Sequence, residues 1–404
     1  MRRVLVVVGH GMVGHRLVRE VRERDAAGAW RVVVLAEEPR PAYDRISLSA
    51  YARGADPGEL ALEGASFDGD EHVGARLSQP AVRIDRAAGA VYCADGSRVA
   101  YDALVLATGA RPFVPPVPGH GLAGCHVYRT LDDVAGIRAA ARPGGPAVVV
   151  GGGLLGLEAA GALAALGMRV QVVEAAPWLM AVQLDEGGGE VLARLLGGLG
   201  VRPRCGVGLR SVDAGPDGAV RSVTLADGEV LDASLVVFST GVRPRDELAA
   251  GADLATGERG GFLVDGRCRT SDPRIRAVGD CAAVHGRCHG LVGPGYRMAE
   301  LVARDLTGDP GPEFTDPDLS AKLKLLGVDV ASFGDAHART AGALEFIRTD
   351  RDGARYAKLV LDGTAGTLLG GVLAGDTAAY ATLRTLLGRR LPGPPDLLLT
   401  GPGG

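Results

Sequence analysis

The chain has 404 residues, enough for two to four compact units, and its hydrophobic content of 47% is normal for a globular protein. A formal net charge of -4 provides no basic face, so binding to nucleic acid is not expected. None of the six cysteines has the C-x-x-C spacing of a redox dithiol, a zinc ribbon or an iron–sulfur site, and the eight histidines show no ligand spacing. We therefore expect no metal site.

The first predicted element is an apolar strand over residues 4–8 that runs directly into a glycine motif. The motif has the form G-x-G-x-x-G, and its glycines are Gly9, Gly11 and Gly14. The first glycine permits a tight turn, the second lets the backbone approach a pyrophosphate, and the third lets the following helix pack closely. That helix offers free N–H groups to phosphates. A second apolar run ends at Glu37, where a carboxylate accepts hydrogen bonds from an adenosine ribose.

The same succession of elements recurs later in the chain. An apolar strand over residues 148–150 leads into a second glycine motif, and the next apolar run ends at Glu174. In each copy a later buried strand ends at a Thr-Gly pair. The second set of glycines is Gly151, Gly153 and Gly156, and the two pairs are Thr108-Gly109 and Thr240-Gly241. A single glycine motif is a weak indicator, but repetition of the whole unit predicts two Rossmann-like units that bind two dinucleotides.

Glu174 indicates which nicotinamide nucleotide the second unit prefers. A carboxylate at this position favours a free ribose 2′-hydroxyl and repels a 2′-phosphate. Residues 175–178 supply no Arg or Lys that could hold such a phosphate. The sequence therefore predicts a preference for NADH over NADPH.

The stretch over residues 147–168 is almost entirely apolar and has the length of a membrane span. Three consecutive glycines and Glu158 interrupt it, so we expect a strand, a glycine turn and a buried helix instead. The apolar run at the N-terminus is too short for a signal peptide, and a glycine motif stands where a cleavage site would be. We expect a soluble, cytoplasmic protein.

Several longer stretches carry a resemblance that covers essentially the whole chain. They are residues 9–16, 37–40, 42–49, 184–186 and 322–332. The sequence resembles the two-dinucleotide flavoprotein reductases that use FAD and NAD(P)H. Within this family it is most similar to the N-terminal flavin module of the NADH-dependent nitrite reductase large subunit.

The resemblance implies an α/β fold with two Rossmann-like dinucleotide-binding domains, as in glutathione reductase, and a small α+β C-terminal domain. The FAD-binding domain would be discontinuous, and the Pro- and Gly-rich tail would be flexible. An irregular loop is expected over residues 64–80. The implied boundaries are residues 1–112 and 245–312 for FAD, 113–244 for NADH, 318–390 for the C-terminal domain and 391–404 for the tail. In the C-terminal domain we expect strands near 328–333, 344–347, 356–361 and 368–373, then a helix over 377–387.

The resemblance also assigns residues to the two cofactors. For FAD it implies the first glycine motif at the pyrophosphate and Glu37 at the ribose. It places Arg45 and Ser49 beside the phosphates, and Thr108 and Gly109 where they close over the cofactor. Asp280 would lie at the ribityl chain or its neighbouring phosphate. For NADH it implies Gly151, Gly153, Gly156 and Glu174.

Glu158 is the one candidate catalytic residue. In the wider family a glutamate at this position lies near the flavin and nicotinamide rings. Acids also favour the first turn of a helix, which is the alternative explanation. Many relatives carry a lysine that pairs with this glutamate, whereas this chain has Ala50 at that position.

The resemblance implies an enzyme that transfers hydride from NADH to FAD and then passes electrons to an external acceptor. That acceptor is expected to be a separate nitrite reductase subunit, a ferredoxin-like carrier or a small molecule. The chain lacks the cysteine ligands of a complete nitrite reductase, so it is not expected to reduce nitrite alone. Two alternatives stay open: a self-sufficient flavoenzyme such as an NADH oxidase, for which Cys281 would be the candidate thiol, and a non-catalytic nucleotide-binding protein. The family also allows a homodimer.

Overall fold

A computed structural model describes residues 2–315, 320–325, 327–350 and 352–399. The chain divides into two compact units. One consists of Met1–Leu48, Asp56–Arg111 and Val242–Pro317, and the other of Ser49–Ala55, Pro112–Gly241 and Asp318–Gly404. No helix in the described ranges has both the length and the apolar character needed to cross a membrane.

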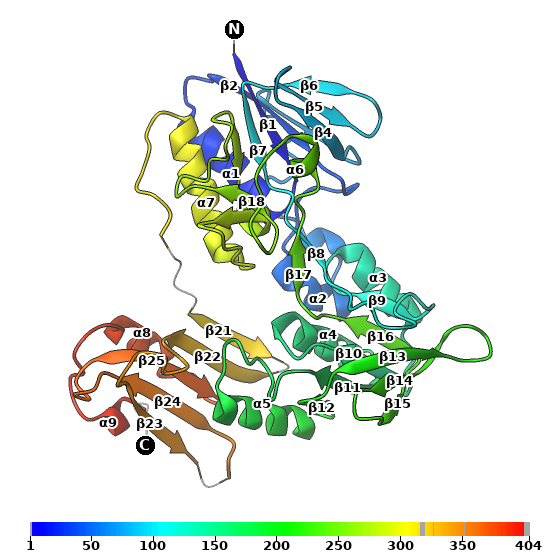
Figure 1. Ribbon diagram of the computed structural model, residues 1–404, viewed down its shortest axis with the longest axis vertical. Coiled ribbons are helices and arrows are strands. Elements are labelled where there is room, and N and C mark those ends of the chain that lie inside the picture. The colour runs from blue at the N-terminus through cyan, green and yellow to red at the C-terminus, as the bar shows by residue number, and fades with distance from the viewer. Residues whose placement is uncertain (1, 316–319, 326, 351, 400–404) are drawn as a thin grey trace. The chain divides into compact units, whose positions relative to one another are not determined.

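The first unit is built on a parallel five-stranded sheet of order β19-β7-β1-β2-β3 (Figure 1). Its strands are β1 (Arg3–Val8), β2 (Trp30–Leu35), β3 (Val73–Arg76), β7 (Ala103–Leu106) and β19 (Ile275–Ala277). The helices α1 (Met12–Arg24) and α7 (Val292–Leu306) pack against each other. Because helices and loops cover the central strands, β1 and β7 are apolar throughout their buried stretches rather than alternating.

Smaller elements complete the first unit. An antiparallel sheet is formed by β4 (Ala81–Asp85), β5 (Ala90–Cys93) and β6 (Arg98–Ala100), and a parallel pair by β18 (Phe262–Val264) and β20 (Ala282–Val284). The strands β8 (Ala110–Pro112) and β17 (Val242–Pro244) pair where the chain crosses between the units. Its short helix is α6 (Leu248–Gly251), and its 3-10 turns lie at Arg45–Ser47, Pro57–Leu60 and Gly279–Cys281. Helix α2 (Leu48–Ala52) begins at the last residue of the stretch Met1–Leu48 and belongs otherwise to the second unit.

The second unit contains another parallel sheet, of order β12-β11-β10-β16-β9. Its strands are β9 (Cys125–Val127), β10 (Pro146–Val150), β11 (Arg169–Glu174), β12 (Arg202–Cys205) and β16 (Leu235–Phe238). The helices are α3 (Leu131–Ala140), α4 (Leu154–Ala165) and α5 (Glu186–Gly198), and a three-stranded antiparallel sheet follows from β13 (Leu209–Ala214), β14 (Val220–Leu225) and β15 (Val230–Asp232).

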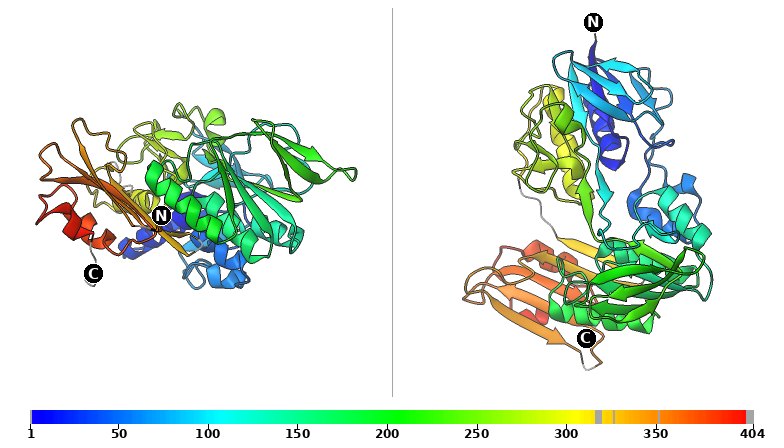
Figure 2. Two further views of the ribbon diagram at one scale, coloured as in Figure 1. Left: turned by 90° about the horizontal axis from the view of Figure 1, so that it is seen from below. Right: turned by 45° about the vertical axis from the view of Figure 1, so that its right-hand side comes forward.

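The same unit also contains an antiparallel sheet of order β21-β22-β25-β24-β23. Its elements are β21 (Ala321–Leu325), β22 (Val328–Gly334), β23 (Leu344–Thr349), β24 (Tyr356–Leu361), β25 (Leu368–Ala374), α8 (Tyr380–Leu386) and α9 (Pro395–Leu398). We call this part the C-terminal sheet. Helix α5 lies against it in both views of Figure 2.

Most of the helices and strands expected in the C-terminal part are present. The structure differs from the prediction at three places: β21, β3 and the C-terminal tail. The sequence did not predict β21, and β3 lies inside the loop expected over residues 64–80. Residues 400–404 of the tail lie outside the described residues. In the described part of the tail, α9 forms and Leu391, Leu398 and Leu399 pack against the apolar core of the C-terminal sheet. The tail is predicted to be flexible because it is rich in Pro and Gly, and that argument leaves out the packing of these leucines.

Candidate functional site: two glycine loops

The first glycine loop has the geometry of a phosphate cradle. Gly9 has φ +111°, and a Cβ on it would overlap the carbonyl oxygen of Ala107 at the end of β7. A Cβ on Gly14 would overlap the carbonyl oxygen of Gly9, so the helix can pack this closely only on a glycine. Gly11 differs from both, because nothing lies within 4 Å of the place where its Cβ would be. It is also the N-cap of α1 and has no side chain to bond the free N–H groups of the helix.

The second loop repeats this geometry. Gly151 has φ +113°, and a Cβ on it would overlap the carbonyl oxygen of Ser239 after β16. A Cβ on Gly156 would overlap Gly151, whereas Gly153 has open space and caps α4 without a side-chain hydrogen bond. Each loop therefore presents an open, uncapped helix N-terminus, and these features fit a pyrophosphate group. Within each predicted set, two glycines lie against backbone and the middle one faces open space.

Parallel strands bring four more of the predicted residues of the first unit to the edge where Gly9 lies. Glu37 follows β2, Thr108 and Gly109 follow β7, and Asp280 follows β19. The carboxyl ends of parallel strands share one edge of the sheet, and this edge is where α/β folds bind their ligands.

Arg245 connects three of these residues, and sequence reasoning did not single it out. Its guanidinium forms an ion pair with Glu37, and its backbone N–H donates to the carbonyl oxygen of Gly109 at 2.9 Å. The hydroxyl of Thr108 donates to the carbonyl oxygen of Arg245 at 2.5 Å. The hydrogen bond to Glu37 raises the pKa of Arg245. The signal for this residue was its place directly after Val242-Arg243-Pro244, the stretch that follows the second Thr-Gly pair.

The second Thr-Gly pair forms the matching set of bonds with Phe113. The hydroxyl of Thr240 donates to the carbonyl oxygen of Phe113 at 2.7 Å, and the Phe113 N–H donates to Gly241 at 2.9 Å. The internal repeat therefore extends to the hydrogen bonding of the Thr-Gly turns. The two copies differ in the side chain held there, which is an arginine in the first unit and a phenylalanine in the second.

Arg45 and Ser49 belong to the short helical segments after residue 44. Arg45 forms an ion pair with Glu38, and its guanidinium lies 5.2 Å from the ring centroid of Tyr43. The preceding Asp44 caps the 3-10 turn by accepting a hydrogen bond from the Ile46 N–H at 2.9 Å. Ser49 lies in α2, in the part of that helix grouped with the second unit.

Glu174 is held differently from its counterpart Glu37. One carboxylate oxygen accepts a hydrogen bond from the N–H of Gly152 at 2.5 Å, and the other accepts from Ala176 at 2.7 Å. The acid at the end of β11 thus fixes the conformation of the glycine loop as well as presenting a negative charge beside it.

The structure corrects the expected position of Glu158. Helix α4 begins at Leu154, so Glu158 is its fifth residue, and the first turn contains no acid. The explanation from first-turn acid preference therefore does not apply, because the helix starts earlier than the glycine spacing suggested. A neighbouring residue that the sequence did not reveal is Tyr128, which directly follows β9. Its buried hydroxyl has no hydrogen-bond partner among the described residues, and burial together with the Glu158 carboxylate raises the pKa of Tyr128.

The Cys281 thiol is buried and protonated, whereas Cys288 is an exposed residue whose thiol is only partly desolvated. Cys281 is fully buried, and its thiol donates to the carbonyl oxygens of Val278 at 3.3 Å and Leu106 at 3.4 Å. Burial raises the pKa of Cys281, and it raises the pKa of Cys288 to about 11. A reactive cysteine needs a lowered pKa, so neither thiol is activated for attack. In the described ranges no group of three or more potential ligands is arranged to hold a metal ion.

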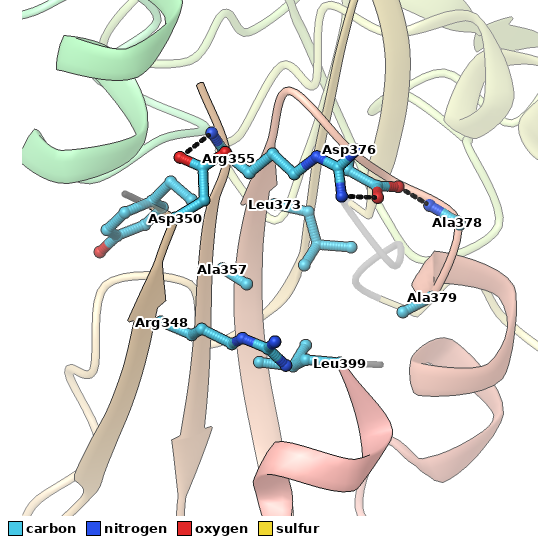
Figure 3. A pocket seen from close by; sticks show the side chains of 10 residues that line it. Arg348, Asp350, Arg355, Ala357, Leu373, Asp376, Ala378, Ala379 and Leu399 are labelled. Carbon is cyan, nitrogen blue, oxygen red and sulfur yellow. Dashed lines mark hydrogen bonds and ion pairs between the residues drawn. The ribbon is translucent and has the colours of Figure 1, made fainter. Parts of the chain in front are cut away.

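A pocket on the C-terminal sheet contains none of the predicted cofactor residues (Figure 3). Three of its charged groups bond to one another. The Arg355 N–H donates to Asp350 at 3.1 Å, and the Arg355 guanidinium lies 3.6 Å from a carboxylate oxygen of Asp376. We assign no cofactor to this pocket.

With this geometry in view, comparison with known proteins identifies the class. The chain belongs to the pyridine nucleotide-disulphide oxidoreductase family, which it matches over residues 3–302. Residues 320–391 match the C-terminal domain of rubredoxin NAD+ reductase.

Three related proteins illustrate the range of the family. The chain is 46% identical over 398 residues to the nitrite reductase [NAD(P)H] large subunit of Klebsiella oxytoca, and the match covers 98% of this chain and 41% of that protein. It is 33% identical over 347 residues to rhodocoxin reductase of Rhodococcus erythropolis, covering 82% of this chain and 79% of that one. A ferredoxin reductase structure from Rhodopseudomonas palustris superposes with a TM-score of 0.85 at 30% identity, covering 96% of each chain. The chain thus spans less than half the length of the Klebsiella oxytoca protein.

These findings confirm the predicted family resemblance and the predicted fold class. They also confirm the class of enzyme, an FAD-dependent NAD(P)H oxidoreductase, and with it FAD and a nicotinamide dinucleotide as cofactors. The roles of individual residues and the domain boundaries stay predictions.

Proposed function

We propose that this chain takes hydride from NADH onto FAD and delivers the electrons to a separate protein acceptor. The observation that carries the proposal is the pair of matching glycine loops, each with an open, uncapped helix N-terminus at Gly11 or Gly153. Two such cradles provide places for a resident flavin dinucleotide and an exchanging nicotinamide dinucleotide. The flavin supplies the redox chemistry, and the chain supplies binding and alignment.

In this proposal the first unit holds FAD through Gly9, Gly11 and Gly14 at the pyrophosphate and Glu37 at the ribose. Arg45 and Ser49 would bind near the phosphates, and Asp280 near the ribityl chain or its phosphate. Arg245 would set the position of Glu37, because the ion pair between them holds the carboxylate next to the Thr108–Gly109 turn. The proposed boundaries are residues 1–112 and 245–312 for this domain, 113–244 for the NADH domain and 318–390 for the C-terminal domain.

The second unit would hold the nicotinamide nucleotide through its own glycines and Glu174. The carboxylate of Glu174 is kept beside the loop by the Gly152 N–H, and a negative charge there disfavours the 2′-phosphate of NADPH. We therefore propose that NADH is the preferred donor. Glu158, next to the buried Tyr128, is the proposed residue near the reacting rings.

A protein acceptor is favoured over a thiol-dependent reaction with a small substrate. Cys281 is fully buried with a raised pKa, so the thiol that an oxidase-type mechanism would use is not available as a thiolate. Relatives that match most of this chain include rhodocoxin reductase and a ferredoxin reductase, which are reductases of protein carriers by name. The proposed acceptor is a ferredoxin-like carrier or a separate nitrite reductase subunit. We keep a homodimer as part of the proposal, to be checked by measuring mass in solution.

The test is anaerobic mixing of the purified, FAD-loaded protein with NADH while flavin absorbance is followed. Rapid bleaching by NADH and much slower bleaching by NADPH would support the reductive half-reaction and the role of Glu174. The reduced protein is then offered oxidised ferredoxin in one sample and oxygen in another. Faster reoxidation by ferredoxin supports the protein acceptor, and faster reoxidation by oxygen would favour an oxidase. A protein that holds no flavin, or is not bleached, would overturn the proposal.

A further inference from the structure

A charged network centred on the buried Lys358 joins the start of α5 to the C-terminal sheet within the second unit. Asp185 is the N-cap of α5 and accepts a hydrogen bond from the Gly188 N–H at 3.1 Å. Its other oxygen accepts a hydrogen bond from the Tyr356 hydroxyl at 2.6 Å and lies 2.7 Å from the ammonium of Lys358. The ammonium also lies 3.0 Å from Glu345 on the neighbouring strand.

Burying the charge of Lys358 costs free energy, so this contact is not explained as an accident of packing. The Lys358 side chain is only 3% exposed, and a charge this deeply buried is tolerated only with close partners. Burial lowers the pKa of Lys358, but the hydrogen bonds to Asp185 and Glu345 outweigh that effect and raise it overall. Burial and the hydrogen bond to Asp185 both raise the pKa of Tyr356. With both pKa values raised, the Lys358 ammonium and the Tyr356 hydroxyl stay protonated at neutral pH.

Three consecutive glycines let the sheet approach the helix this closely. Glycine is the least favourable helix residue after proline, yet Gly187, Gly188 and Gly189 follow one another at the start of α5. A Cβ on Gly187 would overlap the Tyr356 ring, and one on Gly188 would lie 2.8 Å from Val372 of β25. A Cβ on Gly189 would lie 2.6 Å from Trp178. The glycines thus remove the side chains that would separate α5 from its surroundings.

The segment that precedes Asp185 leads back to the second glycine loop. The Met180 N–H donates to the carbonyl oxygen of Gly152 at 3.0 Å, and the Leu184 N–H donates to the carbonyl oxygen of Met180 at 2.8 Å. The indole N–H of Trp178 donates to the carbonyl oxygen of Leu184 at 2.9 Å. A short run of direct hydrogen bonds therefore connects Gly152, between two of the cradle glycines, with the residue next to Asp185.

We propose that Asp185 is a positioning residue for the nicotinamide nucleotide. Through Asp185, the C-terminal sheet holds residues 178–185 in place and so keeps the second glycine loop in its binding conformation. The proposal rests on the assignment of that loop to the nicotinamide nucleotide made above. A loop that is ordered before binding loses less conformational freedom when the ligand arrives, so it binds more tightly. The role given to the C-terminal sheet is thus nucleotide affinity, in addition to any role in packing.

The test separates capping of α5 from attachment to the sheet. Asp185→Ser keeps a good N-cap residue, but its side chain is short and uncharged and loses Tyr356 and Lys358. Tyr356→Phe removes one hydroxyl and leaves the cap intact. Asp362→Asn is the matched control, because Asp362 bonds residues 364–367 within a turn of the same sheet. Binding of NAD+ to the FAD-loaded protein is measured by calorimetry, together with the FAD content and the thermal midpoint.

We expect the dissociation constant for NAD+ to rise roughly three- to tenfold in Asp185→Ser and in Tyr356→Phe, a loss comparable to the net contribution of one ordinary hydrogen bond. The double variant should lose less than the product of the two single losses, because both act through one contact. FAD content should match the unaltered protein, and Asp362→Asn should bind NAD+ normally. Normal NAD+ affinity in both single variants, or an equal loss in Asp362→Asn, would overturn the proposal. Absence of NAD+ binding in the unaltered protein would overturn the assignment of the loop, and the positioning role with it.

Discussion

The two open glycines offer a test in which folding and cofactor binding respond separately. Gly11 has φ -90° and ψ -169°, a conformation that alanine adopts readily, and nothing lies within 4 Å of its would-be Cβ. Gly11→Ala should therefore fold, at a cost of about 1 kcal/mol for a poorer N-cap residue. The new methyl group would occupy the space proposed for the FAD pyrophosphate.

The expected loss of FAD affinity follows from the hydrogen bonds that the methyl group would prevent. A charge-assisted hydrogen bond contributes about 1.5–3 kcal/mol, so preventing two of them costs roughly 3–6 kcal/mol. This corresponds to a loss of FAD affinity of about 10²- to 10⁴-fold. Gly14→Ala is the contrasting variant, because its Cβ would overlap the backbone of Gly9 and should destabilise the fold itself.

The assay compares the ratio of flavin to protein absorbance, the dissociation constant for added FAD, and the thermal midpoint of each flavin-free protein. Gly153→Ala is the matched control in the second loop, where the same open position is found. It should keep FAD and lose NAD+ binding. The reasoning would be refuted if Gly11→Ala bound FAD as tightly as the unaltered protein, or if Gly153→Ala lost FAD and kept NAD+.

Three further predictions concern single charges. Glu174→Gln should move the ratio of kcat/KM for NADH over NADPH roughly tenfold towards NADPH, because it removes one charge near the 2′-position; an unchanged ratio would contradict the role of this acid. Arg245→Met should reduce the free energy of unfolding by no more than about 1 kcal/mol, because the ion pair between Arg245 and Glu37 is half exposed. The same substitution should weaken FAD binding severalfold. An FAD affinity equal to that of the unaltered protein would argue against the positioning role of Arg245. Burial acts to raise the pKa of Asp305, but hydrogen bonds from Arg276 and a second arginine outweigh burial and lower the pKa. The Asp305 carboxylate therefore stabilises the fold at any pH above the pKa of an unfolded aspartate. It loses that contribution as the pH falls through the pKa of Asp305 in the folded protein. Asp305→Asn should cost about 3–5 kcal/mol at pH 7 and flatten the decline in unfolding free energy between pH 7 and 3; a decline as steep as that of the unaltered protein would contradict the assignment.

Features that depend on short-range backbone geometry could be predicted from the sequence. The two glycine loops, the strand-terminal acids and the Thr-Gly turns were predicted from spacing, and the structure gives Gly9, Gly11 and Gly14 the distinct surroundings that the motif implies. These features can be read locally, because a glycine requirement arises from φ angles and from contacts made within one strand–turn–helix unit. The repetition of the unit made the prediction specific.

Contacts between distant residues could be found only in the folded structure. Arg245 lies 208 residues from its partner Glu37, and Lys358 of the C-terminal sheet meets Asp185 at the start of α5. No periodicity or motif in the sequence indicates such pairs, because they depend on how elements far apart in the chain pack against one another. The starting residue of α4, and hence the turn that holds Glu158, was also decided by packing, because the third glycine of the motif lies inside the helix against Gly151 rather than before it.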